Sequence, residues 1–134
     1  MTILKTETVP IKSANDVVVI RQRTRTLAAE IGLSLVDQTK IVTAASELAR
    51  NTLVHGGGGT ATAEVIERDR RMGLRLTFVD YGPGIVDLRM ALKDGFSSGK
   101  GLGMGLSGSR RLVNEFDITS EAGKGTQVII ARWK

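Results

Sequence analysis

Hydrophobic residues recur every three or four positions in two consecutive stretches near the start of the chain. In the first, the apolar positions from Val17 to Ile31 repeat with the period of one helical face. Ser13 or Asn15 can cap the start of this helix, and Gly32 can end it in a left-handed conformation. The pattern predicts a helix that runs to about residue 31.

The second stretch predicts a helix with a wider apolar arc. Ser34 and Asp37 resemble a capping box in which Asp replaces the usual Glu. The apolar residues that follow cover so much of the helix circumference that most of it must be buried. Four successive glycines, 56–59, stop this helix at about His55.

Alternating apolar and polar residues predict strands in the rest of the chain. Strands are expected at 2–11, 60–68, 74–81, 117–121 and 126–133, and further helices at 85–94 and 105–116. Polar and glycine-rich turns at 69–73 and 122–125 join neighbouring strands. The predicted fold is one α+β domain over residues 1–134, a two-layer α/β sandwich whose mixed, mainly antiparallel sheet carries helices on one face.

The composition limits the kind of protein. Hydrophobic residues make up 41% of the 134 residues but aromatic residues only 4%, so aliphatic side chains must fill the core. We find no apolar run of about eighteen residues and no signal-peptide pattern near the start, so we expect no membrane partner. Cysteine is absent, which excludes disulfides and thiolate metal sites and favours a cytoplasmic location.

The net charge of +5 has two interpretations. A basic surface can bind nucleic acid, or it can attract acidic ligands such as a nucleotide or an acidic protein surface. The sequence has no basic stripe interleaved with aromatic residues, which a stacking platform for nucleic acid needs. We therefore expect solvated charges that steer ligands, and no nucleic-acid partner.

Three polar residues form a stripe on the second predicted helix. Glu47, Asn51 and His55 are spaced four residues apart, so they lie on one side of a helix that is otherwise mostly apolar. A carboxylate and an amide one turn apart suit a hydrated Mg²⁺ ion and can orient a hydroxyl group or water. The alternative is a solvated helix face with a Glu47–Asn51 hydrogen bond. His55 by itself fits a helix-end residue better than a catalyst.

Asp80 ends a predicted apolar strand and precedes Gly82, Pro83 and Gly84. A carboxylate at that place can accept a hydrogen bond from an exocyclic amine such as that of adenine. The glycines let the backbone turn sharply and let a flat ring approach, while the proline stiffens the turn. The alternative is an ordinary Asp-x-Gly turn at the end of a strand.

A second glycine-rich segment follows. Its glycines occupy alternate positions, at Gly99, Gly101, Gly103 and Gly105. Such spacing exposes successive N–H groups to an anion, and a helix starting at Gly105 adds its dipole. The spacing matches neither the dinucleotide-binding fingerprint nor the Walker A motif. A flexible linker would carry serine where this segment has Leu102, Met104 and Leu106.

Together these segments resemble the GHKL ATPase and kinase superfamily, which has the Bergerat ATP-binding fold. The N box is similar to residues 47–51, the first glycine box to 80–84, the second to 101–106, and the late Gly-Thr box to 123–126. The chain lacks the phosphoacceptor histidine of sensor kinases and the transducer domain of the gyrase and Hsp90 branches. It is therefore most similar to the small protein serine/threonine kinases. Within them, residues 46–51, 94–97 and 111–116, the last before 123–126, resemble the stressosome switch kinases more than the anti-sigma-factor kinases.

The resemblance implies roles for individual residues. Asn51 would ligate Mg²⁺ that bridges the phosphates of ATP, and Glu47 would act as a base or orient the attacking hydroxyl group. Asp80 would bind the adenine amine, helped through a water by Gly84 and Thr126. The remaining predicted ligand contacts are Gly82 in the first glycine box, Lys100 in a lid over 95–101, and Gly101, Leu102, Gly103, Met104, Gly105 and Leu106 around the phosphates.

The resemblance also implies a function. The protein would transfer the γ-phosphoryl group of MgATP to a serine or threonine of a STAS-domain partner, a stressosome scaffold or antagonist, and would then activate a phosphatase. One alternative is an anti-sigma-factor kinase. Another is a nucleotide-gated docking module that switches a phosphatase or a sigma factor mainly by binding.

Overall fold

The computed structural model describes residues 1–85, residue 92 and residues 102–134, with only the backbone over 102–105. Its strands form one five-stranded sheet in the order β1-β2-β3-β5-β4. The strands are β1 (Thr2–Ile11), β2 (Gly59–Arg68), β3 (Arg71–Asp80), β4 (Glu115–Glu121) and β5 (Gly125–Trp133). Each neighbouring pair in this sheet is antiparallel, which confirms the mainly antiparallel prediction.

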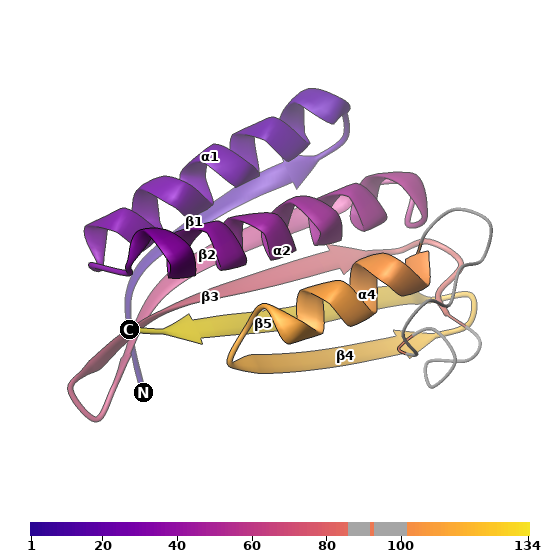
Figure 1. The fold of residues 1–134 in the computed structure, drawn as a ribbon. Helices are drawn as coiled ribbons and strands as arrows, with labels where there is room; N and C mark the ends of the chain where they lie inside the picture. Colours follow the sequence, from indigo (N-terminus) through magenta and orange to yellow (C-terminus); the bar gives the residue numbers. More distant parts are fainter. Residues whose placement is uncertain (86–91, 93–101) are drawn as a thin grey trace.

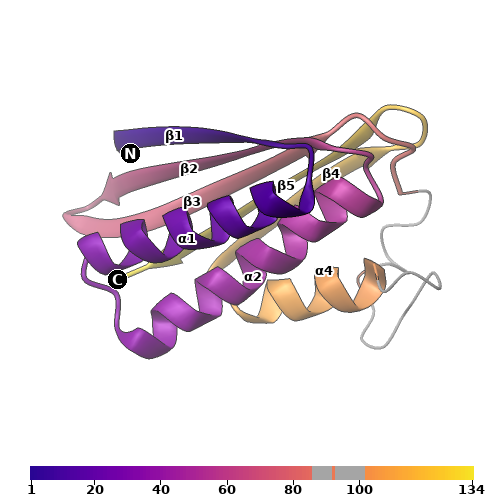
Figure 2. The ribbon, with the colours of Figure 1, turned by 90° about the horizontal axis from the view of Figure 1, so that it is seen from above.

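Helices cover one face of the sheet, as predicted. They are α1 (Ala14–Glu30), α2 (Leu35–Val54) and α4 (Leu102–Arg111), and Figure 2 shows them as a second layer beside the sheet. Ser13 is the N-cap of α1, and the Ser34 hydroxyl caps α2 by accepting a hydrogen bond from the Asp37 backbone N–H. The capping residues chosen from the sequence therefore define both helix starts.

The core lies between the two layers and is almost entirely aliphatic. Alternate residues of β3 and β5 point into it, because successive side chains of a strand face opposite sides of the sheet. Fully buried side chains from both layers include Ile20, Leu27, Ile41, Leu48, Leu74, Leu76, Phe78 and Ile130. Burial of this apolar area is the main favourable term in folding.

The β2–β3 hairpin is tighter than predicted. The expected turn over 69–73 is a two-residue turn, with Asp69 at φ 53° and Arg70 at φ 66°. Gly73 therefore lies inside β3, opposite Trp133 of β5. A Cβ atom on Gly73 would come within 2.6 Å of the Trp133 ring, so this glycine serves packing across the sheet and not the turn.

The helix predicted over 105–116 occupies 102–111. Its earlier start places Gly103 and Gly105 within the helix despite the poor helix propensity of glycine, and the helix lies against α2. It ends earlier because the Asn114 N–H donates to the Ala131 carbonyl of β5, which starts the next strand. Phe116 is thus a residue of β4, where it lies opposite Ile130 and packs on the core.

Two predictions fall mostly outside the described residues. Of the short helix expected over 85–94, the structure describes only Ile85 and Leu92, and both pack against the core. The lid expected over 95–101 is not described, so the prediction for Lys100 stays a prediction.

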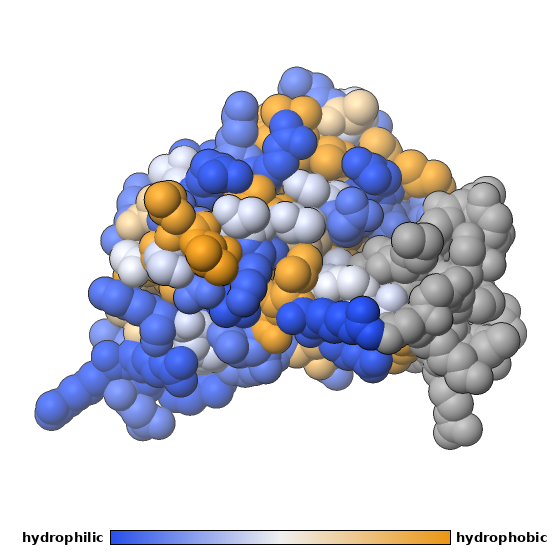
Figure 3. Space-filling view, viewed as in Figure 1, coloured by the Kyte–Doolittle hydropathy of each residue, from blue (hydrophilic) through white to orange (hydrophobic). Residues whose placement is uncertain are grey.

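The helix-side surface carries hydrophobic residues in separate groups among hydrophilic ones (Figure 3). Leu35 and Val36, in the first turn of α2, are 76% and 64% exposed. Within the described ranges, every helix is too short or too polar to cross a membrane.

Candidate functional site

Most of the residues singled out in the sequence come together at one end of the molecule. The C-terminal ends of α2 and β3 meet the N-terminal ends of β5 and α4 there (Figure 1). Asn51 belongs to α2, Asp80 to β3 and Thr126 to β5. Segments far apart in the sequence thus supply one site.

A row of residues across the sheet forms the base of this site. Asp80 lies opposite Gly59 on one side and opposite Thr126 on the other, and Thr126 lies opposite Ser120. Asp80 shares its side of β3 with the buried Phe78, so the row faces the helices. Gly59 has no side chain, so the two polar side chains at the middle of the row are those of Asp80 and Thr126.

The Asp80 carboxylate is half-buried and partly held by the backbone. Its Oδ1 atom accepts a hydrogen bond of 3.0 Å from the Gly82 N–H. Burial raises the pKa of Asp80, while the N–H groups of Gly82 and Thr126 and the charge of His55 oppose that rise. A carboxylate in this setting is an acceptor for a ligand N–H group.

Glycines pack tightly around this carboxylate. A Cβ atom on Gly56 would come within 2.3 Å of Asp80 Cγ, and one on Gly82 within 2.6 Å of the Gly56 carbonyl oxygen. Gly125 has φ +108°, and a Cβ atom there would come within 2.1 Å of the Asp80 carbonyl oxygen. We call Gly56, Gly82 and Gly125 the glycine cluster. Any side chain at these positions would displace the backbone around Asp80 or the carboxylate itself.

Ser120 joins the segments around the site, and the sequence interpretation missed it. Its hydroxyl lies 2.8 Å from the Thr126 hydroxyl and 3.1 Å from the Gly125 carbonyl oxygen, and it accepts a hydrogen bond of 2.8 Å from the Ile85 N–H. The available signal was its place two residues after Ile118, on the inward side of a strand. The sequence also treated Gly56 only as a helix stop.

The polar stripe on α2 has one unsatisfied member. Asn51 Nδ2 is buried and has no hydrogen-bond partner among the residues that the structure describes. Because an ionised Glu47 is only an acceptor, the alternative Glu47–Asn51 hydrogen bond would need this nitrogen, and it is not made. Glu47 instead lies 3.6 Å from Arg50, in a pair whose side chains are 39% and 62% exposed. Buried polar groups normally have partners, so Asn51 fits a ligand contact.

His55 is the C-cap of α2 and lies near enough to Asp80 for its charge to act on that carboxylate. Gly57, with φ +73°, then turns the chain away, and the Gly58 N–H donates to the Thr52 carbonyl oxygen. The glycine run thus ends the helix, as predicted.

The second glycine segment differs from the prediction in one respect. Because α4 begins at Leu102, Gly103 and Gly105 are helical residues and do not form a loop before the helix. The N–H groups of the first turn of a helix have no partner within the helix, so they can still bind an anion. The Leu106 side chain is only 1% exposed and belongs to the core, and the predicted ligand contact of this residue stays a prediction.

The chain was compared with known protein families. Residues 36–134 match the family of histidine kinase-, DNA gyrase B- and HSP90-like ATPases. The chain belongs to this ATPase family. The match covers α2, the whole row across the sheet from β2 to β4, and α4. The family match therefore agrees with the family that the four sequence boxes indicated.

Two curated relatives narrow the comparison within the ATPase family. The chain is 44% identical over 118 residues to the serine/threonine-protein kinase RsbT of Bacillus subtilis (strain 168), which covers 88% of this chain and 89% of that protein. It is 28% identical over 111 residues to the anti-sigma F factor of Clostridium acetobutylicum, with 78% and 76% covered.

Solved structures agree in fold. The crystal structure of the RsbU and RsbW domains from Mycobacterium tuberculosis matches with a TM-score of 0.66 and 20% identity, over 98% of this chain and 33% of that one. The SiaB–SiaC complex of Pseudomonas aeruginosa matches with a TM-score of 0.56 and 14% identity, over 98% and 91%. At these identities the likeness concerns the α+β fold.

Proposed function

We propose that this protein is an ATP-dependent protein serine/threonine kinase that transfers the γ-phosphoryl group of MgATP to a serine or threonine of a partner protein. The observation that carries the proposal is that Asp80, enclosed by the glycine cluster, and the unsatisfied amide of Asn51 lie at the same end of the fold. The 44% identity to a serine/threonine-protein kinase supports phosphoryl transfer over other uses of ATP.

The adenine end of the site is formed by β3 and β5. The Asp80 carboxylate accepts a hydrogen bond from the exocyclic amine, and Thr126 and the Gly84 backbone contribute through a water. The glycine cluster places no side chains beside the Asp80 carboxylate, so that a flat ring can approach. Ser120 holds the Thr126 hydroxyl in place through its 2.8 Å contact.

The phosphate end is formed by α2 and α4. The Asn51 side-chain oxygen would hold Mg²⁺, while its unsatisfied Nδ2 donor would suit a phosphate oxygen. The first turn of α4 presents N–H groups to the phosphates. Mg²⁺ prefers oxygen ligands and, when bound, neutralises charge on the phosphate oxygens. In the described residues no group of three histidine or acidic side chains gathers around a metal position. The proposed ligand set therefore combines Asn51 with phosphate oxygens of the substrate.

Glu47 lies one turn before Asn51 and is accessible to a second protein. In the transfer, the oxygen of the acceptor hydroxyl forms a bond to the γ-phosphorus while the bond to the bridging oxygen breaks and ADP leaves. Glu47 accepts the hydroxyl proton or orients that hydroxyl. Phosphoryl transfer depends mainly on such positioning and on charge stabilisation.

The proposed partner is a STAS-domain protein of the stressosome scaffold or antagonist type, and the proposed location is the cytoplasm. The similarity of residues 46–51 and 111–116 to stressosome switch kinases supports this partner. Activation of a phosphatase after release from the scaffold belongs to the same proposal. A second candidate is a nucleotide-gated docking module, favoured by the 28% identity to an anti-sigma factor.

Incubation with labelled MgATP and a STAS-domain protein encoded in the same genome tests the proposal. The kinase proposal expects label on a serine or threonine of that partner. The docking alternative expects nucleotide-dependent capture of a phosphatase or sigma factor that persists in a Glu47→Ala variant without transfer.

A further inference from the structure

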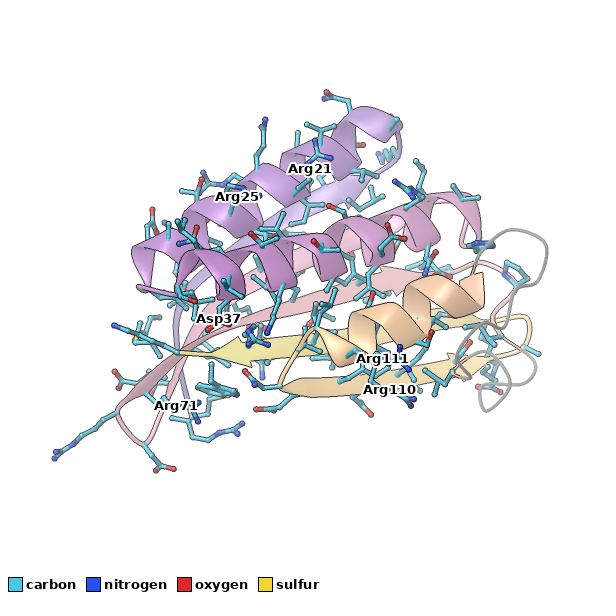
Figure 4. The ribbon with its side chains drawn as sticks, in the orientation of Figure 1. Arg21, Arg25, Asp37, Arg71, Arg110 and Arg111 are labelled. Carbon is cyan, nitrogen blue, oxygen red and sulfur yellow. The ribbon has the colours of Figure 1, made fainter. Side chains whose placement is uncertain are left out.

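A partly buried ion pair joins three of the elements of the site, α2, α4 and β5, at the ends opposite to the site. Arg132, near the end of β5, donates from Nη2 to Asp37 Oδ1 at 2.7 Å and from Nη1 to the Leu112 carbonyl oxygen at 3.0 Å. Asp37 lies in the first turn of α2, as Figure 4 shows, and Leu112 directly follows α4. The guanidinium group of this β5 residue therefore links β5 to α2 and to the end of α4.

The strand β5 and the helix α2 place the side chains of Arg132 and Asp37 so that they meet. Arg132 shares its side of β5 with Val128 and Ile130, so it points toward the helices. Asp37 does not complete a capping box and uses its carboxylate for Arg132, whose hydrogen bond lowers the pKa of Asp37. The side chains are only 14% and 31% exposed.

The pair is better suited to fixing geometry than to adding stability. Arg132 Nε is buried and has no hydrogen-bond partner in the described part of the chain, so part of the desolvation cost of the guanidinium is not recovered. Buried ion pairs frequently contribute little net stability, whereas in some proteins they specify one arrangement of the elements that they join. The elements joined here are the two helices that carry the phosphate end of the proposed site.

Half of the helix α4 consists of small residues, which offer little side-chain packing to fix its position. Glycine or serine occupies positions 103, 105, 107, 108 and 109 of its ten residues. Ser109 Oγ is buried without a hydrogen-bond partner within the described ranges, so that side chain adds no polar link to them. The contact from Arg132 to Leu112 is a polar restraint on where α4 ends relative to α2.

We propose that Arg132 is a positioning residue of the nucleotide site, which fixes the placement of the α4 first turn relative to Asn51 by tying the far ends of α4 and α2 to β5. The proposal rests on the proposed function, because it assumes that ATP phosphates bind between those two helices. It predicts that the two ends of ATP respond differently to the loss of Arg132. The phosphate end depends on Arg132, whereas the adenine end, built on β3 and β5, does not.

Matched variants test this difference. Arg132→Gln removes the ion pair, and Arg23→Gln is the control, because Arg23 makes two similar hydrogen bonds of 2.7 and 2.9 Å to Glu7 but joins α1 to β1. Calorimetry would give the dissociation constants for ATP and for adenosine, and thermal unfolding would give the Tm of each variant. Arg132→Lys keeps the charge and serves if Arg132→Gln does not fold.

We expect Arg132→Gln to weaken ATP binding by roughly tenfold and to leave adenosine binding within about twofold of wild type. Arg132→Lys should fall between wild type and Arg132→Gln, and Arg23→Gln should lower the Tm without changing either affinity. Equal loss of ATP and adenosine affinity, or unchanged ATP affinity in both Arg132 variants, would overturn the inference. Failure of the wild-type protein to bind ATP would overturn the proposed function and this inference with it.

Discussion

Asp80 and Thr126 lie opposite each other on β3 and β5, although 46 positions separate them in the sequence. Their side chains face the helix layer at the edge of the core, where the backbone of Gly125 contacts the Asp80 carbonyl oxygen too closely for any Cβ atom. The late Gly-Thr box and the first glycine box are therefore one structural unit. This unit is the basis of the predictions that follow.

Replacement of Asp80 by asparagine should weaken ATP binding. The amide keeps the shape of the side chain and one acceptor oxygen but loses the charge that strengthens a hydrogen bond to the adenine amine. A charge-assisted hydrogen bond contributes about 1.5–3 kcal/mol, so the dissociation constant measured by calorimetry should rise about tenfold or more. Asp117→Asn is the matched control, because Asp117 is exposed and pairs with Ile129 on the other face of the sheet. An Asp80→Asn protein with wild-type affinity would exclude the adenine contact.

The same variant should be more stable than wild type at neutral pH. Burial raises the pKa of Asp80 above its ordinary value of 3.8, so the ionised form is less favourable in the folded protein than in the unfolded chain. This cost is present when the pH is above the raised pKa and disappears as the pH falls below 3.8. The Tm advantage of Asp80→Asn should thus shrink on acidification. A constant advantage across the pH range would contradict this origin.

Gly56→Ala should damage the site, because the new Cβ atom would overlap the Asp80 carboxyl group. We expect at least a tenfold loss of ATP affinity together with about 1–3 kcal/mol of lost stability. Gly108→Ala is the control, since a Cβ atom there meets nothing within 4 Å and the residue lies in α4. That substitution should be neutral or stabilise the fold by up to about 1 kcal/mol. Wild-type nucleotide affinity in Gly56→Ala would show that the glycine is not needed for the site.

Gly73→Ala tests the packing across the sheet. Its Cβ atom would press on the Trp133 ring, which also stacks under Arg68 at 4.9 Å and donates from Nε1 to Glu115. Chemical denaturation should show a loss of about 1–3 kcal/mol. In a Trp133→Leu background the same change should cost less, because the smaller side chain leaves room. An equal cost in both backgrounds would place the strain elsewhere.

The sequence predicted the parts of the fold that depend on neighbouring residues. The periods of the first two helices, the capping residues Ser13 and Ser34, and the glycines that end both helices are local signals, and the structure agrees with them. The alternation of the strands likewise identified each strand to within a few residues. Local propensity and burial pattern point the same way in these segments.

The errors came from contacts between distant segments. Gly73 looks like a turn residue until Trp133, on another strand, is placed against it. The limits of α4 depend on its packing against α2 and on the bond from Asn114 to Ala131. The Asp37–Arg132 pair spans 95 residues, so no local pattern marks it. In the site, the boxes located Asp80 and Thr126, but Ser120 follows only from the strand register.

The most direct test of the account is phosphoryl transfer by the Glu47→Ala protein. Glu47 is half-exposed and lies one helical turn from Asn51, so its loss should leave ATP binding intact. With labelled MgATP and a STAS-domain partner from the same genome, we predict label on a serine or threonine of the partner with the wild-type protein. The Glu47→Ala protein should bind ATP with wild-type affinity and transfer no label. Equal labelling by both proteins, or no labelling by a wild-type protein that binds ATP, would contradict the account.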